Sequence, residues 1–209
     1  SRRSGNNIDF TFNLESNSST PSGTSDIYCH LGTIGNYYIN AALPYNQWYY
    51  ISLSYDGLNL RVYANAVLVL DTIVNNPGGI GNNHNTLRLG YDNINSWYEG
   101  YFDDFEIWDI PLSQQEIQQY MNCPPTGDES GLVGYWNFEE GSGNTVYDQT
   151  SNGNDGTING VTYDINVASK SCNLTNINGC DSTAVLNLTI NQSDTSYTNI
   201  TACDSVSWN

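Results

Sequence analysis

The chain has 209 residues, enough for one or two domains, and 22 Asp and Glu against 5 Lys and Arg give it a formal charge of −17 at pH 7. Such acidity repels nucleic-acid phosphates and anionic lipid surfaces, so we expect neither as a partner. Divalent cations and neutral sugars are compatible with it, and it favours a soluble monomer. No run approaches the roughly eighteen apolar residues of a membrane span, which argues against membrane insertion.

Alternating apolar and polar residues predict short β-strands along the first half of the chain. Turn residues separate them, as in Gly35-Asn36, Asp56-Gly57 and Asn65-Ala66. This pattern predicts an all-β domain. The expected strands cover residues 8–14, 26–34, 37–43, 48–55, 58–63, 67–70, 86–91 and 98–109.

One short helix is expected after the last of these strands. Pro111 cannot donate to a sheet, so the strand should stop before it. Ser113 and Glu116 have the spacing of a capping box, and Ile117 begins an apolar stripe behind them. Cys123-Pro124-Pro125 should end the helix.

Residues 100–108, GYFDDFEIW, followed by Pro111-Leu112-Ser113, resemble the close of a laminin-G-like domain of the concanavalin A-like lectin/glucanase superfamily. Residues 47–57 resemble the central tryptophan strand of that family, and residues 60–65 resemble its next hairpin. The resemblance covers residues 8–121. It implies an all-β, concanavalin A-like jelly-roll sandwich with one short helix, whose core would hold Trp48, Trp108 and Trp136.

The usual first strand of such a domain is missing before Ile8. A matching sequence, GLVGYWNF, occurs later, at residues 131–138. Residues 131–168 either close the first unit, as in a circular permutation, or open a truncated second domain. Closure is favoured because an open sheet edge is costly.

Four parts are therefore expected. Residues 1–123 form the jelly roll, residues 124–130 a linker, residues 131–168 the opening strands, and residues 169–209 a small β-rich segment. The last part repeats Cys-Asp-Ser and resembles cysteine-containing β-repeats in large adhesin-like surface proteins of bacteria. That resemblance implies neighbouring domains in a longer chain.

The five cysteines, Cys29, Cys123, Cys172, Cys180 and Cys203, include no C-x-x-C pair, so a zinc site is not expected. Cys172 and Cys180 flank a turn-like loop and could bridge, and Cys29 could pair with Cys123. Disulfides persist in oxidising compartments, so the cysteines predict an extracellular or cell-surface location.

A structural calcium ion is the cofactor that the residues favour. Calcium needs several oxygen ligands, and Asp148, Asn152 and Asn154 offer carboxylate and amide oxygens within a turn-rich segment. Asp103 or Asp104 could join them if residues 131–165 pair beside the last strand, and many relatives hold calcium. The alternative is that the aspartates only cap strand edges and start turns.

A sugar site is expected where a flat aromatic ring lies among polar groups. Trp97 and Tyr98 adjoin Asp92, Asn93 and Asn95 in one loop, although Trp97 could equally be part of the core. The second candidate is a set of tyrosines, Tyr37, Tyr38 and Tyr45.

A different class of function is suggested by Asp104-Phe105-Glu106-Ile107-Trp108-Asp109. Laminarinase-type glucanases of the same superfamily carry Glu-x-Asp-x-x-Glu, whose outer carboxylates act as nucleophile and general acid. The spacing here is the same but the acid types are swapped, and a retaining glycosidase needs carboxylates about 5–5.5 Å apart. A closing strand of a laminin-G-like domain accounts for this stretch completely, so no enzymatic activity is expected.

These observations predict a non-catalytic carbohydrate-binding or adhesion module of a large secreted or cell-surface bacterial protein. Its partner would be a glycan or a cell-surface protein. A structural spacer or protein-interaction module is one alternative, and a glycan-cleaving enzyme of the laminarinase type is the other.

Overall fold

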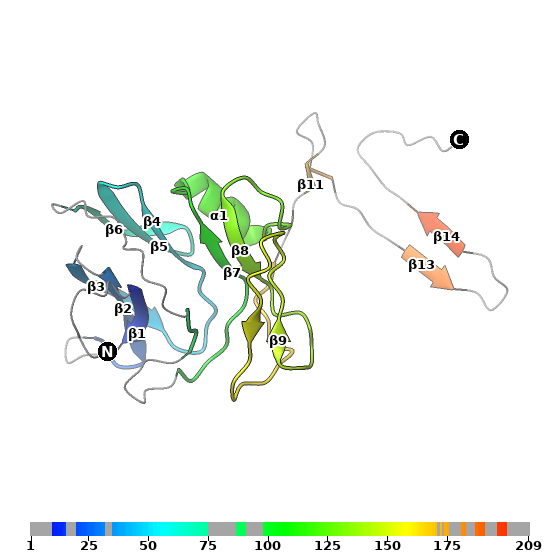
Figure 1. Cartoon of the computed structure of the whole chain (residues 1–209), viewed down its shortest axis with the longest axis horizontal. Coiled ribbons are helices and arrows are strands. Elements are labelled where there is room, and N and C mark those ends of the chain that lie inside the picture. Colours follow the sequence, from blue (N-terminus) through cyan, green and yellow to red (C-terminus); the bar gives the residue numbers. More distant parts are fainter. Residues whose placement is uncertain are drawn as a thin grey trace. The chain divides into compact units, whose positions relative to one another are not determined.

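The computed structural model describes residues 10–15, 20–31, 35–74, 87–90 and 98–170, together with residues 172, 174–175, 181–182, 187–190 and 196–199. The chain divides into two compact units, residues 1–168 and residues 169–209. The described elements are β-strands and one helix (Figure 1). No helix in these ranges is long and apolar enough to cross a membrane.

Two three-stranded antiparallel sheets form most of the first unit, in the orders β1-β2-β3 and β4-β5-β6. Consecutive strands are neighbours in each sheet. The Asp56-Gly57 and Asn65-Ala66 turns lie where expected, whereas Gly35 and Asn36, expected to form a turn, belong to β3 and pair with Leu31 and His30. Their strands are β1 (Phe10–Glu15), β2 (Thr24–Leu31), β3 (Gly35–Pro44), β4 (Ile51–Tyr55), β5 (Asn59–Ala64) and β6 (Val67–Ile73).

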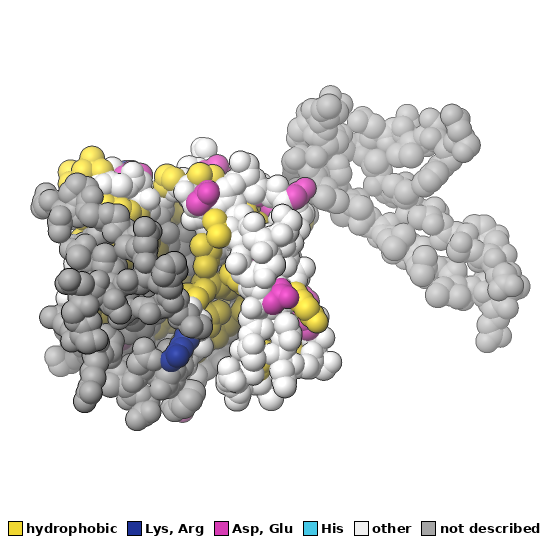
Figure 2. All heavy atoms as spheres, in the orientation of Figure 1, with side chains coloured by type: hydrophobic (Ala, Val, Ile, Leu, Met, Phe, Trp, Pro, Cys, Tyr) yellow, Lys and Arg dark blue, Asp and Glu magenta, His cyan; other side chains and the backbone are white. Residues whose placement is uncertain are grey.

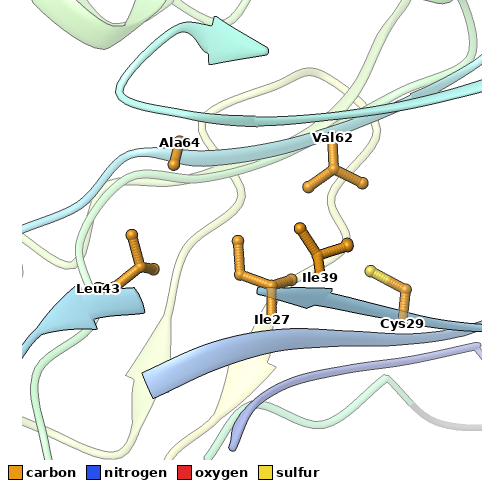
Figure 3. Close-up of a cluster of buried hydrophobic side chains, with 6 residues drawn as sticks. All are labelled: Ile27, Cys29, Ile39, Leu43, Val62 and Ala64. Carbon is orange, nitrogen blue, oxygen red and sulfur yellow. The ribbon is translucent and has the colours of Figure 1, made fainter. Parts of the chain in front are cut away.

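The core lies between these two sheets. Alternation along β2 and β3 turns one set of side chains inward, and alternation along β5 does the same from the other sheet. Figure 3 shows the two sets facing each other. The facing residues are Ile27, Cys29, Ile39 and Leu43 from the first sheet and Val62 and Ala64 from the second. The first unit is thus the expected all-β sandwich.

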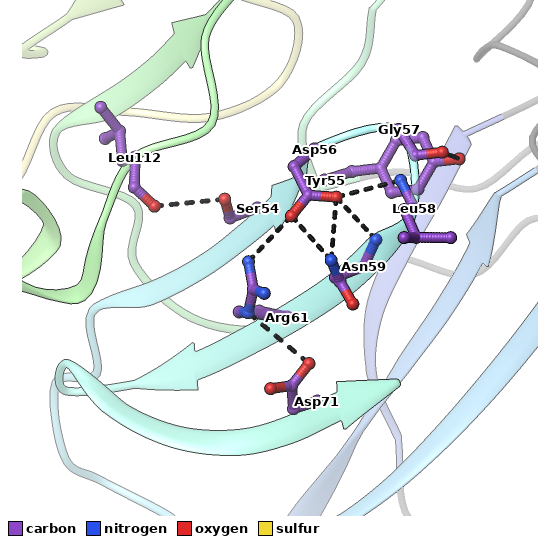
Figure 4. Close-up of polar contacts among 9 residues, drawn as sticks. All are labelled: Ser54, Tyr55, Asp56, Gly57, Leu58, Asn59, Arg61, Asp71 and Leu112. Atoms are coloured by element: carbon purple, nitrogen blue, oxygen red, sulfur yellow. Dashed lines mark hydrogen bonds and ion pairs between the residues drawn. The ribbon is translucent and has the colours of Figure 1, made fainter. Parts of the chain in front are cut away.

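The turn between β4 and β5 is organised by the carboxylate of Asp56 (Figure 4). It accepts hydrogen bonds from the backbone nitrogens of Leu58 and Asn59 at 3.0 and 2.7 Å. Hydrogen bonds from Asn59 above all, and then from Leu58, hold the pKa of Asp56 below its usual range. Arg61 bridges Asp56 and Asp71 at 3.1 and 3.5 Å, so the turn is tied to β6 as well.

The helix α1 (Gln114–Asn122) covers the outer face of the β4-β5-β6 sheet. Ser113 and Glu116 form the predicted capping box, and the helix ends at Cys123 as expected. Ile117 is fully buried against Tyr63 and Ala66. α1 therefore adds a third layer on one side of the sandwich.

The strand β7 (Phe105–Trp108) pairs antiparallel with β8 (Leu132–Trp136), so residues 131–168 lie in the same compact unit as the two sheets. The ring of Trp136 lies over Gly134, where a Cβ would come 2.4 Å from it. Only glycine permits that approach. A shorter pair, β9 (Thr145–Val146) and β10 (Gly156–Thr157), follows.

The second unit contains two short antiparallel pairs. β11 (Leu174–Thr175) pairs with β12 (Asp181–Ser182), and β13 (Asn187–Ile190) pairs with β14 (Ser196–Asn199). Their presence agrees with the small β-rich segment predicted for residues 169–209.

Two of the expected strands differ from the structure. Residues 87–90 form no strand, and the strand expected over 98–109 is limited to β7. Asp104 has a φ of 47°, which interrupts the extended backbone just before β7. Trp48 precedes β4, is half-buried and has its ring centroid 6.0 Å from that of Tyr101, so its expected place in the core is wrong.

The cysteine pairing is also corrected in part. Cys29 is a free, fully buried thiol that points into the sandwich core, whereas Cys123 and Cys172 are disulfide-bonded. The proposed pair of Cys29 with Cys123 is therefore wrong, because the side chain of Cys29 is enclosed by apolar neighbours. Cys180, the proposed partner of Cys172, lies outside the described residues.

Cys29 should be chemically silent in the folded chain. Burial raises the pKa of its thiol to about 12, and the thiolate is the reactive form. We expect no alkylation by iodoacetamide at pH 8 until denaturant is added, as measured by peptide mass mapping. Rapid labelling of Cys29 under native conditions would contradict the packing described here.

Candidate functional site

The carboxylates of Asp104 and Glu106, just before and within β7, meet aromatic side chains from two distant segments and from β7 itself. Oε2 of Glu106 accepts hydrogen bonds from the Tyr50 hydroxyl at 3.2 Å and from Trp108 Nε1 at 2.9 Å. Oδ1 of Asp104 accepts one from the Tyr135 hydroxyl at 2.7 Å. We call these five residues the acid–aromatic cluster.

Burial determines the electrostatics of this cluster. It raises the pKa of Glu106 to about 7; hydrogen bonds from Trp108 and Tyr50 oppose that rise, and the carboxylates of Asp104 and Glu129 add to it. The pKa of Tyr50 is raised by burial and by Glu106. Oε1 of Glu106 is buried with no hydrogen-bond partner among the residues that the structure describes.

The positions of Asp104 and Glu106 can be compared with what a glucanase active site requires. A glycosidase pair must flank a sugar cleft, with one carboxylate free to attack or to activate water. Here Asp104 and Glu106 are half-buried and bound to Tyr135, Tyr50 and Trp108. Two surface hollows in the described part are lined elsewhere, by residues 126–128 with 149–151 and by Gly141 with residues 163–165.

The segment from Asp148 to Asn154, here called the Asp148 loop, is held by one buried carboxylate. Oδ1 of Asp148 accepts from the backbone nitrogen of Tyr135 and from both the nitrogen and the hydroxyl of Thr150, at 2.8–3.1 Å. Oδ2 accepts from the backbone and side-chain nitrogens of Asn154, both at 2.9 Å. Asn152 and Asn154 also donate to the carbonyl of Val133 at 2.9 and 3.0 Å.

The structure therefore brings together Asp148, Asn152 and Asn154, but the amides of Asn152 and Asn154 act there as hydrogen-bond donors. A carboxylate has about four lone-pair sites, and five donors already occupy those of Asp148. Burial acts to raise the pKa of Asp148, but the hydrogen bonds from Asn154, Thr150 and Tyr135 outweigh it and lower that pKa. This arrangement does not fit a calcium site.

The other predicted calcium ligands lie at a different point. Asp104 binds the hydroxyl end of Tyr135, whereas Asp148 binds its backbone nitrogen, and Asp103 is half-buried next to Asp104 in the chain. Among the described residues no group of three or more His, Cys, Asp or Glu side chains could hold a metal ion. Figure 2 agrees for the face that it draws, where acidic side chains are scattered.

Of the predicted sugar site, only Tyr98 is described. Its ring is 43% exposed and its centroid lies 4.9 Å from that of Phe102, which is also exposed. Its backbone nitrogen donates to the carbonyl of Gly90 at 3.0 Å. The other four predicted residues, Asp92, Asn93, Asn95 and Trp97, lie outside the described residues.

The second candidate set divides between core and surface. Tyr37 packs against the sandwich core, while Tyr38 and Tyr45 are 67% and 50% exposed. Alternation along β3 could have separated Tyr37 from Tyr38. No local signal could have linked Tyr50 to Glu106, because 56 residues separate them.

Three comparisons with known proteins bear on this arrangement. Residues 1–118 match the family described as the concanavalin A-like lectin/glucanases superfamily. The chain is 34% identical to human (Homo sapiens) pappalysin-1 over 89 residues, which are 40% of this chain and 5% of that protein. It also resembles a crystal structure of an S-layer domain-containing protein (residues 221–444) from Clostridium thermocellum ATCC 27405, with 21% identity and a TM-score of 0.28, over 54% of this chain and 63% of that one.

The sandwich, its single described helix and the family match define a concanavalin A-like jelly roll, as the sequence predicts. The chain belongs to the concanavalin A-like lectin/glucanases superfamily, with the match covering more than half of its length. It spans less than two thirds of the length of either protein that it resembles.

The cluster predicts that stability falls as the pH rises. The pKa of Glu106 goes from a usual 4.5 to about 7 on folding, so its contribution is complete below pH 4.5 and is lost as the pH rises through 7. Between pH 5 and pH 8 the free energy of unfolding should drop by about 2 kcal/mol more in the wild type than in Glu106→Gln. Urea unfolding at both pH values measures this, and Glu139→Gln, an exposed change, is the control.

The Asp148 loop gives a second prediction. Asp148→Ala leaves several buried donors without an acceptor and should lower the free energy of unfolding by about 3 kcal/mol, against little change for the exposed Asp164→Ala. Thermal melts in millimolar calcium and in EDTA should coincide for the wild type. A calcium-dependent rise in Tm that Asp148→Ala abolishes would instead support the ion predicted from sequence.

Proposed function

We propose that this chain is a non-catalytic carbohydrate-binding or adhesion module of a large secreted or cell-surface bacterial protein. The observation that carries this proposal is that Asp104 and Glu106, two of the three glucanase-like acids, serve as internal contacts in a chain of the lectin/glucanase superfamily. The superfamily includes lectins and glucanases. Engagement of these acids in packing disfavours the glucanase role and therefore favours a lectin-like binding role.

The absence of catalysis is part of the proposal, and the acid–aromatic cluster supports it. Glu106 does not present a free carboxylate to a substrate. Its Oε2 accepts hydrogen bonds from Tyr50 and Trp108, and its Oε1 is buried. Asp104 is held by Tyr135. Neither of the two hollows described above is lined by these acids.

A glycan is the favoured partner because exposed tyrosines occur on a strongly acidic surface. Tyr38, Tyr45 and Tyr98 each expose 43% or more of their surface, and the chain carries a formal charge of −17. Aromatic rings can stack on neutral sugars, whereas the charge disfavours phosphate-bearing partners. A cell-surface protein or a purely architectural role is the alternative.

An extracellular location is supported by the disulfide-bonded Cys123 and Cys172, since disulfides persist in oxidising compartments. The short strand pairs of residues 169–209 suit the cysteine-containing repeat that this segment resembles. Neighbouring domains on the same chain would then present the jelly roll at a surface.

The test is retention of the whole chain on a panel of immobilised neutral polysaccharides, in millimolar calcium and again in EDTA. We expect retention by at least one neutral polysaccharide in both buffers, because the Asp148 loop is held without an ion. Folded protein that no polysaccharide retains would move the assignment to a structural or protein-binding segment. Release of reducing sugar, lost in Glu106→Gln, would favour the glucanase instead.

A further inference from the structure

The outward face of the β1-β2-β3 sheet carries a row of side chains of which only Tyr38 has been given a role so far. Because β2 turns Ile27 and Cys29 into the core, it turns Tyr28 to the opposite face. The strand register places Tyr28 directly between Asn13 of β1 and Tyr38 of β3. These three residues therefore form a line across the sheet.

The two tyrosines in this line are held in place. Their ring centroids are 4.5 Å apart at an interplanar angle of 36°. The Tyr28 hydroxyl donates to Oδ1 of Asn36 at 3.1 Å, and Nδ1 of His30 lies 2.6 Å from the same oxygen. Tyr28 is thus fixed through its ring and its hydroxyl, and it supports Tyr38, which is 67% exposed.

We propose that this face binds a neutral polysaccharide chain, with a sugar ring stacked on Tyr38 and its hydroxyl groups bonded by the neighbouring amides and imidazole. We call the face the tyrosine platform. The proposal rests on the carbohydrate-binding function proposed above and gives it a site on the sheet, away from the loop that the sequence favours. The platform consists of Asn13, Tyr28, His30, Asn36, Tyr38 and Asn40.

Charge and chemistry select this partner. The platform presents amides, hydroxyls and an imidazole, and it ends at Glu15, whose carboxylate accepts from the Asn13 amide at 3.1 Å. On a chain of charge −17 such a face disfavours acidic polymers. An apolar protein segment would cover the Asn40 amide and the side-chain nitrogen of Asn36 and offer them no hydrogen bonds, which is costly. A sugar covers the ring with C–H groups and offers hydroxyls to the amides.

The experiment uses affinity electrophoresis of the intact chain in gels that contain barley β-glucan, xylan or galactomannan. Tyr38→Ala should weaken retardation by about tenfold or more, since a stacked aromatic and its buried area contribute that much. Tyr38→Phe should keep most of it because the ring remains. Tyr147→Ala is the matched control, since Tyr147 is 54% exposed in a different segment.

A measurement on the wild type makes the test independent of any variant's folding. Nitration with tetranitromethane, followed by mass mapping, should show Tyr38 protected by the retarding polysaccharide while Tyr147 stays reactive. Binding that survives Tyr38→Ala, or that leaves Tyr38 unprotected, overturns the platform but not the carbohydrate-binding function. Equal loss in Tyr147→Ala also overturns the platform. A folded wild type that no polysaccharide retards overturns both.

Discussion

The pairing of β7 with β8 is the interaction on which the rest of the compact unit depends. β7 carries Glu106, which reaches Tyr50 just before β4, and β8 carries Tyr135, which binds Asp104 through its hydroxyl and Asp148 through its backbone nitrogen. Two short strands therefore connect the β4-β5-β6 sheet to the Asp148 loop. Separating them would remove the Tyr135 hydroxyl from the half-buried Asp104, in addition to the ladder hydrogen bonds between the two strands.

The same carboxylates illustrate why a spacing of acids does not by itself define an active site. A strand with alternating acids can direct them into a cleft or against neighbouring aromatics, and the sequence of the strand is similar in both cases. What differs is the partner: here Tyr50 and Tyr135 supply hydroxyl donors, and burial favours the neutral form of Glu106. A raised pKa would also suit the general acid of a glycosidase, so the argument against catalysis is the engagement of both acids by neighbouring hydroxyl and indole donors, which keeps them from a substrate.

Features set by neighbouring residues were predictable from sequence. The Asp56-Gly57 turn, the Asn65-Ala66 turn and the capping box of α1 all follow from residues within a few positions of one another. Features set by distant partners were not. The positive φ of Asp104, the half-buried position of Trp48 and the free thiol of Cys29 depend on how separate segments pack, and sequence spacing carries no record of that packing. For the predicted calcium ligands, the sequence indicated correctly that Asp148 and Asn154 lie close together, but it did not indicate that they meet as hydrogen-bond acceptor and donor.

Rigidity favours the sheet face over a loop as the place for a sugar. Side chains on paired strands keep their spacing because the register fixes it, so little conformational freedom remains to be lost on binding. Tyr28 and Tyr38 are directly opposite each other in that register, and the hydrogen bond from the Tyr28 hydroxyl to Asn36 restrains Tyr28 further. A loop aromatic has no such support unless its own loop is ordered. The tyrosine platform would therefore lose less conformational entropy on binding. A flat face contacts each sugar over a small area, and an extended polysaccharide offsets this by contacting several side chains along the row.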